Sequence, residues 1–435
     1  MSNASGVPGI SGTAGLAMLT GLSGDELVLF SGVSDSRLNA YYRNELRSTA
    51  AQSIGTELWV GVGGLGWYTY IFSCNAAIEG LSASNALTPA VKQQLLGEAR
   101  FLRAFFYFYL VNLYGNVPLI LTTDPSVNAV SRQATAQQVY EQIVSDLKDA
   151  VDLLSIDYLN GSLVRYPGVA ERVRPTKWAA AALLARTYLY LGNYQEAGKY
   201  AEDVINQQSL FQLAGLDDVF IKGSTEAIWQ LQPVKTGRNT EEAFAFVLGA
   251  NGPTPSANLN PVYLSTQLLN DFTADDQRRF NKHWIDSVIV LGTTYYFPFK
   301  YKQKQTTESP TEYLMILRLG EIFLIRAEAR ARAGLVEEGL LDLNTVRSRA
   351  GAAALAITDP AVLLEAVWQE RKRELFTEMG HRWLDLKRTN KVNAVMQQMT
   401  PLKGGVWQST DQLYPIPFSD IQKNGNLVQN PGYEQ

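Results

Sequence analysis

One apolar stretch, GEARFLRAFFYFYLVNLYGNVPLI from Gly97 to Ile120, limits most strongly what this chain can fold into. Its middle part, Ala104–Val111, contains eight residues without a charge, five of them aromatic. A helix needs about 20 apolar residues to cross a bilayer, so the stretch is too short to span one. Apolar side chains recur at a spacing of three to four residues and also occupy the opposite face. The pattern predicts a helix that is buried among other helices and ends at Gly115.

Two further segments predict pairs of packed helices. In the segment Pro175–Ile205, the pattern L-G-x-Y-x-E-A is typical of the turn in a tetratricopeptide-type helix pair. The segment Arg318–Gly351 has the same arrangement, with Gly334 in the place of Gly192. Because these segments are far apart in the chain, we expect a helical scaffold with a large insertion and not a regular solenoid.

The other segments predict one more helix, a broken helix and two irregular regions. A helical period predicts a helix from about Thr135 to Leu154, and glycines at 61, 63, 64 and 66 interrupt the helix predicted from Trp59 to Leu81. Residues 210–315 are rich in Gly, Pro, Asn and Thr, which predicts short strands and loops that could bind a ligand. In the tail, Tyr414–Pro417 must be extended, and we expect its polar neighbours to hydrogen-bond to the scaffold.

Composition argues against several classes of function. The 435 residues carry a net charge of −4 without a long Lys/Arg block, so nucleic acid is a poor candidate partner. Two histidines, His283 and His381, are too few for a His-rich metal site, and the single Cys74 cannot form an internal disulfide. Because nucleophile-elbow, Walker and dinucleotide motifs are absent, we expect no catalytic residue, no cofactor and no metal.

The charged segment Glu370–Arg388, ERKRELFTEMGHRWLDLKR, has two possible interpretations. Its carboxylates and histidine could act in acid–base chemistry, but ion pairing within and between helices is the better explanation. We predict an i,i+4 pair between Glu378 and Arg382 and an i,i+3 pair between Asp385 and Arg388. The remaining arginines are expected to tie helix ends to neighbouring loops through bidentate bonds.

Two smaller features have the same structural interpretation. Glu98, Arg100 and Arg103 are expected to form an ion-pair network around the buried helix and not a ligand site. Cys74 follows an apolar face and is expected to be a buried, unreactive thiol.

Several stretches, taken in this order, resemble the SusD/RagB family of outer-membrane nutrient-binding lipoproteins. They are GEARFLRAFFYFYLVNLYGNVPLI, AEARARAG with LNTVRSRAG, ERKRELFTEMGHRWLDLKR and LYPIPFSDIQKNGNLVQNPGY. With the pair PTKWAAAALLARTYLYLGNYQEA they extend from about residue 25 to the end of the chain. The resemblance implies a mainly α, SusD-like fold in which four tetratricopeptide-like helix pairs support an irregular, loop-rich half with short β strands.

The resemblance also implies how the chain is organised. Residues 1–435 would form a single SusD-like domain. The helical scaffold would comprise about 60–208 and 313–400, the ligand-facing insertion about 209–312, and the C-terminal tail 401–435.

The function implied by the resemblance is non-catalytic. The protein would bind an oligosaccharide at the cell surface and deliver it to a TonB-dependent, SusC-like transporter. The family carries a signal peptide and a lipid-modified cysteine, so a lipid anchor in the outer membrane is expected. The first residues here lack the positive n-region of a signal peptide, and Cys74 lies too deep in the chain to be the anchor.

Other functions remain open from the sequence. The ligand could be a peptide, as for some relatives, or the helical scaffold could dock a protein segment on its concave face. A hydrolase with a carboxylate pair ranks last, because the sequence places no such pair in a cleft.

The ligand contacts are predicted from the chemistry of sugars. Sugar C–H faces stack on Trp and Tyr, while sugar hydroxyls need polar partners, so loop aromatics beside polar residues are the candidates. Packing in the core is the competing explanation for each. The predicted ligand-binding residues are Tyr41, Tyr42, Arg43, Trp59, Trp67, Tyr68, Trp284 and Tyr295.

Overall fold

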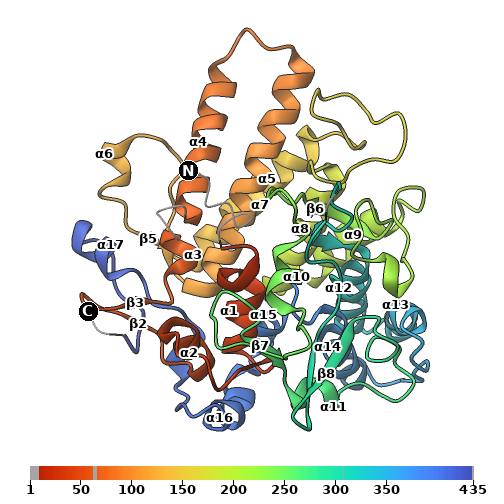
Figure 1. Ribbon diagram of the computed structural model, residues 1–435. Coiled ribbons are helices and arrows are strands. Elements are labelled where there is room, and N and C mark those ends of the chain that lie inside the picture. The colour runs from red at the N-terminus through yellow and green to blue at the C-terminus, as the bar shows by residue number, and fades with distance from the viewer. Residues whose placement is uncertain (1–8, 62–65, 307, 434–435) are drawn as a thin grey trace.

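The long helix α5 (Pro89–Tyr114) rises beside α4 (Trp67–Ala83) at the top of the view in Figure 1, and its second half, residues 101–114, is almost entirely buried. The computed structural model describes residues 9–61, 66–306 and 308–433. Helix α5 packs against α4 on one side and α7 (Ala136–Leu153) on the other. The predicted buried helix is confirmed, but it begins earlier than the apolar stretch, because Pro89 is favourable in a first turn.

The two predicted helix pairs are confirmed. Helices α8 (Lys177–Tyr190) and α9 (Tyr194–Ile205) form one pair, and α12 (Leu319–Arg332) and α13 (Val336–Arg349) form the other. Gly192 and Gly334 occupy matching left-handed turns, with φ of 71° and 78°. Helix α9 also packs on α12, so the two pairs adjoin in space. The insertion therefore leaves the scaffold after one pair and returns to it at the next.

The remaining helices are short, apart from α14 and α16. They are α1 (Leu16–Ser23), α2 (Ser36–Arg43), α3 (Glu57–Val60), α6 (Pro125–Asn128), α10 (Glu241–Phe246), α11 (Thr266–Asn270), α14 (Pro360–Leu375), α15 (His381–Arg388), α16 (Val392–Leu402) and α17 (Phe418–Lys423). The described residues also include the 3₁₀ turns η1 (Gly12–Ala14), η3 (Leu216–Asp218) and η4 (Ser409–Gln412).

The strands form five separate antiparallel pairs within the described residues. They are β1 (Leu27–Leu29) with β7 (Val262–Leu264), β2 (Arg47–Ser48) with β3 (Ser53–Ile54), β4 (Val117–Pro118) with β5 (Gln133–Ala134), β6 (Ala227–Leu231) with β10 (Leu314–Arg318), and β8 (Ile285–Val290) with β9 (Thr293–Pro298). The register places Val28 opposite Tyr263 in the first pair, which joins the N-terminal region to the insertion. This arrangement confirms the predicted mainly α fold with short strands.

The interrupted helix near residue 60 is also confirmed, as α3 followed by α4. Glycines 63 and 64, which we predicted to break it, lie outside the described residues.

The helix predicted from Thr135 is α7, where the Thr135 side chain caps the first turn in a capping box with Gln138. Across the described part of the chain, none of the helices is long and apolar enough to traverse a membrane.

One predicted ion pair is wrong and another is confirmed. Glu378 does not pair with Arg382, because it lies in the turn between α14 and α15, where an i,i+4 helical spacing does not exist. Arg382 instead forms a bidentate bond to Asp25, with both distances 2.8 Å. Asp385 and Arg388 are paired at 2.6 Å as predicted.

The predicted network around α5 is confirmed as a structural one. Arg103 forms a bidentate pair with the fully buried carboxylate of Asp146 on α7, at 2.8 and 2.7 Å. Glu98 pairs in the same way with Arg174, which precedes α8. Cys74 is buried, and burial raises the pKa of its thiol to about 12, so the thiol is unreactive at neutral pH.

The C-terminal tail is held to the scaffold by amide side chains, as predicted. The buried Asn430 donates from Nδ2 to the carbonyl oxygens of Tyr114 at 2.8 Å and Tyr414 at 2.7 Å. The exposed Asn426 donates to the carbonyl of Val130 at 2.9 Å. Asn430 therefore links the end of α5 to the extended tail.

We predict that Asn430→Ala destabilises the protein far more than Asn426→Ala. The first substitution leaves two buried carbonyl groups without a donor, at about 1–3 kcal/mol each, whereas water replaces the exposed amide of Asn426. Thermal unfolding of the three proteins measures the difference. Equal melting temperatures for the two variants would show that the tail is not anchored through Asn430.

A cleft beside helix α10

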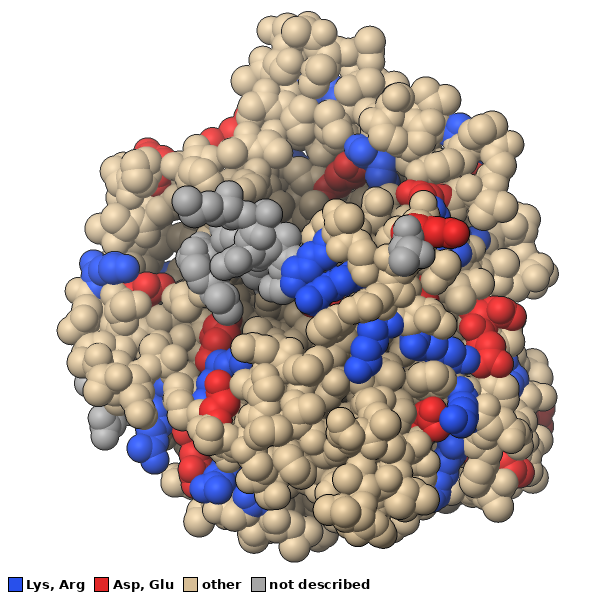
Figure 2. All heavy atoms as spheres, in the orientation of Figure 1, with Lys and Arg blue, Asp and Glu red and all other residues tan. Residues whose placement is uncertain are grey.

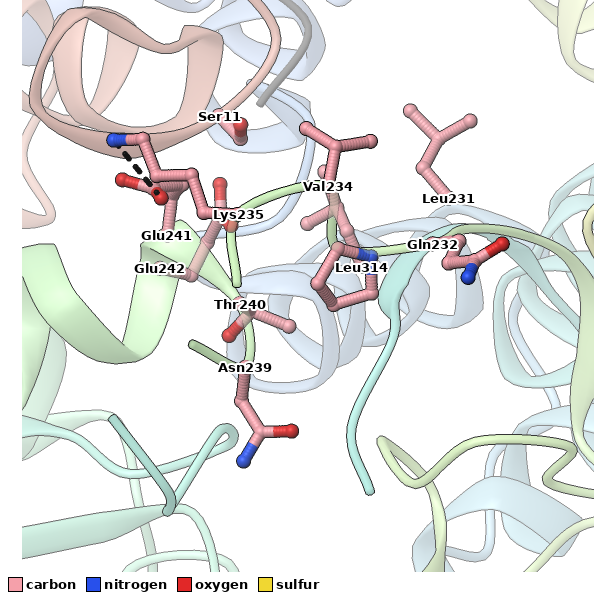
Figure 3. Close-up of a pocket in the computed structure, with 11 residues that line it drawn as sticks. Ser11, Leu231, Gln232, Val234, Lys235, Asn239, Thr240, Glu241, Glu242 and Leu314 are labelled. Carbon is pink, nitrogen blue, oxygen red and sulfur yellow. Dashed lines mark ion pairs between the residues drawn. The ribbon is translucent and has the colours of Figure 1, made fainter. Parts of the chain in front are cut away.

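A cleft with a volume of about 90 Å³ lies where the chain leaves β6 and enters α10 (Figure 3). Its lining includes the apolar side chains of Leu231, Pro233, Val234 and Leu314. The polar lining residues are Ser11, Gln232, Lys235, Asn239, Thr240, Glu241 and Glu242. The lining therefore comes from the insertion, from β10 and from the N-terminal region.

The fold holds the walls of the cleft in place through backbone contacts. Leu314 pairs with Leu231 in the β6–β10 ladder, so the two apolar walls share one short sheet. Thr240 caps α10 by accepting a hydrogen bond from the backbone N–H of Ala243 at 3.2 Å. The buried side chain of Asn239 accepts from the N–H of Thr311 at 2.8 Å. The cleft is therefore built on ordered elements, with exposed side chains only along its rim.

Charged groups gather at one end of the cleft. Glu241 pairs with Lys235 at 3.4 Å and with Arg238 at 3.3 Å. In Figure 3, Lys235 and Glu241 lie side by side, with the ion pair marked between them. Lys235 lines the cleft, and Arg238 lies just outside the lining, on the other side of the shared Glu241 carboxylate. Their side chains are 29% and 31% exposed.

Glu242 lies beneath this charged end and is only 3% exposed. Its Oε1 accepts a hydrogen bond from the N–H of Gly12 at 3.3 Å, and its Oε2 has no partner among the described residues. Burial raises the pKa of Glu242 to about 8, and the neighbouring charge of Glu241 acts in the same direction. The carboxyl group is therefore mostly neutral at pH 7.

This combination of side chains suits a ligand that is both apolar and rich in hydroxyl groups. The apolar wall can contact C–H groups, while Gln232 and Lys235 can hydrogen-bond to oxygen atoms. In the part of the chain that the structure describes, no cluster of three or more His, Cys, Asp or Glu side chains is arranged to hold a metal ion.

Four of the eight predicted ligand-binding residues are buried. Tyr41, Trp59, Trp67 and Trp284 are each 3% exposed or less, so their rings have no face available to a ligand. The polar atoms of three of them are used inside the protein. Tyr41 donates to Glu57 at 2.6 Å, Trp59 to Asp420 at 3.0 Å, and Trp284 to the carbonyl of Leu216 at 2.8 Å. In this structure these side chains pack the core.

The other four predicted residues retain some exposed surface. Tyr42 and Tyr295 both lie near Tyr263, and the ring centroids of Tyr263 and Tyr295 are 5.1 Å apart. Arg43 is exposed beside Tyr42, whereas the hydroxyl of Tyr68 donates to the carbonyl of Pro118 at 2.9 Å. None of the eight lines the cleft beside α10.

The lining residues of the cleft were not singled out by the sequence. They lie mostly in LQPVKTGRNTEEAFAF, a segment noted only for its polar and turn-forming composition. The useful signal was the sequence Thr240-Glu241-Glu242 at the start of a short helix, because two adjacent acids beside Lys235 and Arg238 predict paired charges. Selecting aromatic residues alone therefore did not draw attention to this cleft.

Comparison with known families identifies the class of protein. A model described as "SusD family" matches residues 292–433, and one described as "Starch-binding associating with outer membrane" matches residues 23–189. SusD-like protein P2 of Formosa agariphila is 26% identical over 418 residues, covering 84% of this chain and 79% of the relative. The starch-binding protein SusD of Bacteroides thetaiotaomicron is 36% identical over 135 residues, covering 29% and 22%. The chain belongs to the SusD family.

Solved structures show the same fold. A SusD superfamily protein from Parabacteroides distasonis superposes with a TM-score of 0.80 at 22% identity, covering 96% of this chain and 93% of the other. A laminarin-binding SusD-like protein superposes with a TM-score of 0.78 at 24% identity, covering 97% and 95%. The expected SusD-like fold is confirmed over nearly the whole chain.

We predict that Glu242→Gln stabilises the protein more at pH 8 than at pH 5. Between pH 4.5 and about 8 the unfolded wild type loses the Glu242 proton while the folded protein keeps it. Raising the pH therefore favours unfolding of the wild type, by on the order of a few kcal/mol across this range. Glutamine has no such proton, so the variant lacks this loss of stability.

Melting temperatures at pH 5 and pH 8 test this prediction. Glu337→Gln, at an exposed carboxylate on α13, is the control and should show the same small difference at both pH values. If the melting temperatures of Glu242→Gln and the wild type differ by the same amount at pH 5 and pH 8, Glu242 is already ionised in the folded protein.

Proposed function

We propose that this protein binds oligosaccharides at the outer face of the outer membrane and delivers them, without cleaving them, to a TonB-dependent transporter. The observation that supports binding most directly is membership in the SusD family together with a cleft of mixed apolar and polar lining. The match to a family described as starch-binding and associated with the outer membrane supports the ligand class and the location.

Relatives support the same proposal. One relative is a starch-binding protein, and structural neighbours include a laminarin-binding protein and a surface glycan-binding protein from Bacteroides uniformis. Transfer to a transporter is the part of the proposal that rests on the family resemblance alone.

Within the chain, we assign the primary contacts to the cleft beside α10. The exposed Gln232 and Val234 provide a hydrogen-bonding group and an apolar surface side by side, which is what the alternating hydroxyl and C–H groups of a sugar require. Tyr42 and Tyr295 stay in the proposal as stacking groups for a longer ligand, because each keeps part of its ring exposed.

The double variant Gln232→Ala with Val234→Ala is expected to weaken glycan binding by roughly tenfold, because it removes one hydrogen bond and one apolar contact. Calorimetry with starch and laminarin oligosaccharides measures the affinity, and chromatography of the same samples shows whether the glycan is cleaved. Val406→Ala, at a valine that is 75% exposed and distant in sequence, is the control and should bind like the wild type.

Three results would contradict the proposal in different ways. Absence of binding to every glycan in a broad panel would remove the ligand class. Wild-type affinity of the double variant would move the site away from the cleft. Cleavage products formed by the pure protein would exclude a purely binding function.

Delivery needs a separate experiment. Tagged full-length protein mixed with solubilised outer membranes of the source organism should retain a TonB-dependent transporter, identified by mass spectrometry. Retention of no such transporter would leave glycan binding intact and remove the delivery step.

A further inference from the structure

The charges around the cleft do not balance. Lys235 and Arg238 share the single carboxylate of Glu241, and Glu242 beside it is mostly neutral at pH 7. A third cation, Lys304, precedes Gln305, which forms an isolated β-bridge with Arg238. The backbone carbonyl of Lys304 accepts a hydrogen bond from the N–H of Asn239 at 3.3 Å. Lys304 donates to the side chain of Asn260 at 3.2 Å and has no carboxylate partner in the described ranges. The cleft is locally positive on a chain whose net charge is −4.

The two nearby carboxyl groups of the facing segment, Glu308 and Glu312, form no ion pair with these cations among the described residues. The carboxylate of Glu312 is 5% exposed and accepts the backbone N–H groups of Lys302 and Gln303 at 2.7 and 3.1 Å. Glu308 lies at a separate hollow with Thr306 and Gly237. Figure 2 shows Lys and Arg side chains gathered near the centre of this face beside a hollow.

Taking the proposed glycan-binding function as its basis, we propose that the cleft prefers an acidic saccharide, whose carboxylate pairs with Lys235 and Arg238. Both cations are partly exposed, and a second carboxylate would give each of them a partner of its own. Arg238 is also held in place, with its guanidinium 3.8 Å from the ring centroid of Phe244, so little side-chain freedom is lost on binding. The apolar wall of Leu231, Val234 and Leu314 then contacts the sugar ring.

Glu242 makes this preference depend on pH. The groups that face it are Glu241 on the same helix, Lys235 in the cleft, the hydroxyl of Tyr301, and Lys300 across a small second cavity. The turn η1, which packs against α10, contributes only the backbone N–H of Gly12. Ionisation of Glu242 as the pH rises through about 8 adds a second negative charge to the lining of the cleft, which opposes binding of an acidic ligand.

The test compares matched ligands that differ only in charge. Uronate oligosaccharides from pectate and from alginate, each with its neutral methyl ester, are titrated into the wild type at pH 6.5 and low salt. The uronate forms are expected to bind at least tenfold more tightly than their esters. The variant Lys235→Gln with Arg238→Gln should lose this difference, while Lys199→Gln, at a lysine that is 62% exposed on α9, should keep it.

The pH dependence provides an independent test. Affinity of the wild type for the uronate ligands should fall at least threefold between pH 6.5 and pH 9, whereas Glu242→Gln, which mimics the neutral carboxyl group, should show no fall. Equal fall in both proteins would overturn the role of Glu242. Circular dichroism of each variant confirms that it is folded before it is compared.

Other outcomes separate this inference from the proposed function. If neutral glycans bind and every uronate binds no more tightly than its ester, the preference for acidic sugars is overturned and glycan binding stands. If neither neutral nor acidic glycans bind, the proposed function itself fails.

Discussion

The carboxylate of Glu374 on α14 is the point at which the scaffold and the insertion are joined. It accepts hydrogen bonds from Arg318 at the end of β10 at 2.5 Å, from Arg278 of the insertion at 2.7 Å, and from Arg349 of α13. Burial acts to raise the pKa of Glu374, but the charges of these three arginines outweigh it and hold the pKa well below its ordinary value. Because removal of one partner of a buried ion pair leaves an uncompensated charge, this arrangement tolerates few changes. The insertion is therefore anchored to the helices by buried ion pairs.

The cleft depends on this junction. Arg318 also bonds to Glu226, at 2.8 Å, and Glu226 directly precedes β6, whose last residue, Leu231, forms a wall of the cleft. Lys300 donates to the carbonyl of Glu374 at 2.9 Å and borders the small cavity behind Glu242. The same charged network thus sets the position of both the front and the back of the site. A rigid support of this kind allows rim side chains to vary without loss of the fold.

Much of the fold could be predicted from the sequence, because its signals are local. The period of α5, the glycine turn after α8 and its counterpart after α12, and the prolines of Tyr414–Pro417 each act within a few residues. The partners of charged residues could not be predicted in the same way. Glu378 lies four residues before Arg382, but the chain turns between them, and Glu378 bonds to Arg318, which is 60 residues away. Such long-range pairs become visible only when the tertiary structure is known.

The site shows the same limit in a sharper form. Trp284 follows His283 in a loop-rich segment, where an aromatic ring is a reasonable ligand contact, but it packs against Phe220 and lies under Lys300. A ring in a loop is buried whenever the loop folds onto the core, and sequence does not record which loops do so. The proposed site beside α10 instead contains Lys235, Arg238 and two acids, and sequence does not show how their charges are shared. Lys235 and Arg238 share the one carboxylate of Glu241, and burial keeps the carboxyl group of Glu242 mostly neutral. Both features depend on distances and burial, which only the folded structure shows. They make the cleft locally positive, although the net charge of the whole chain is −4.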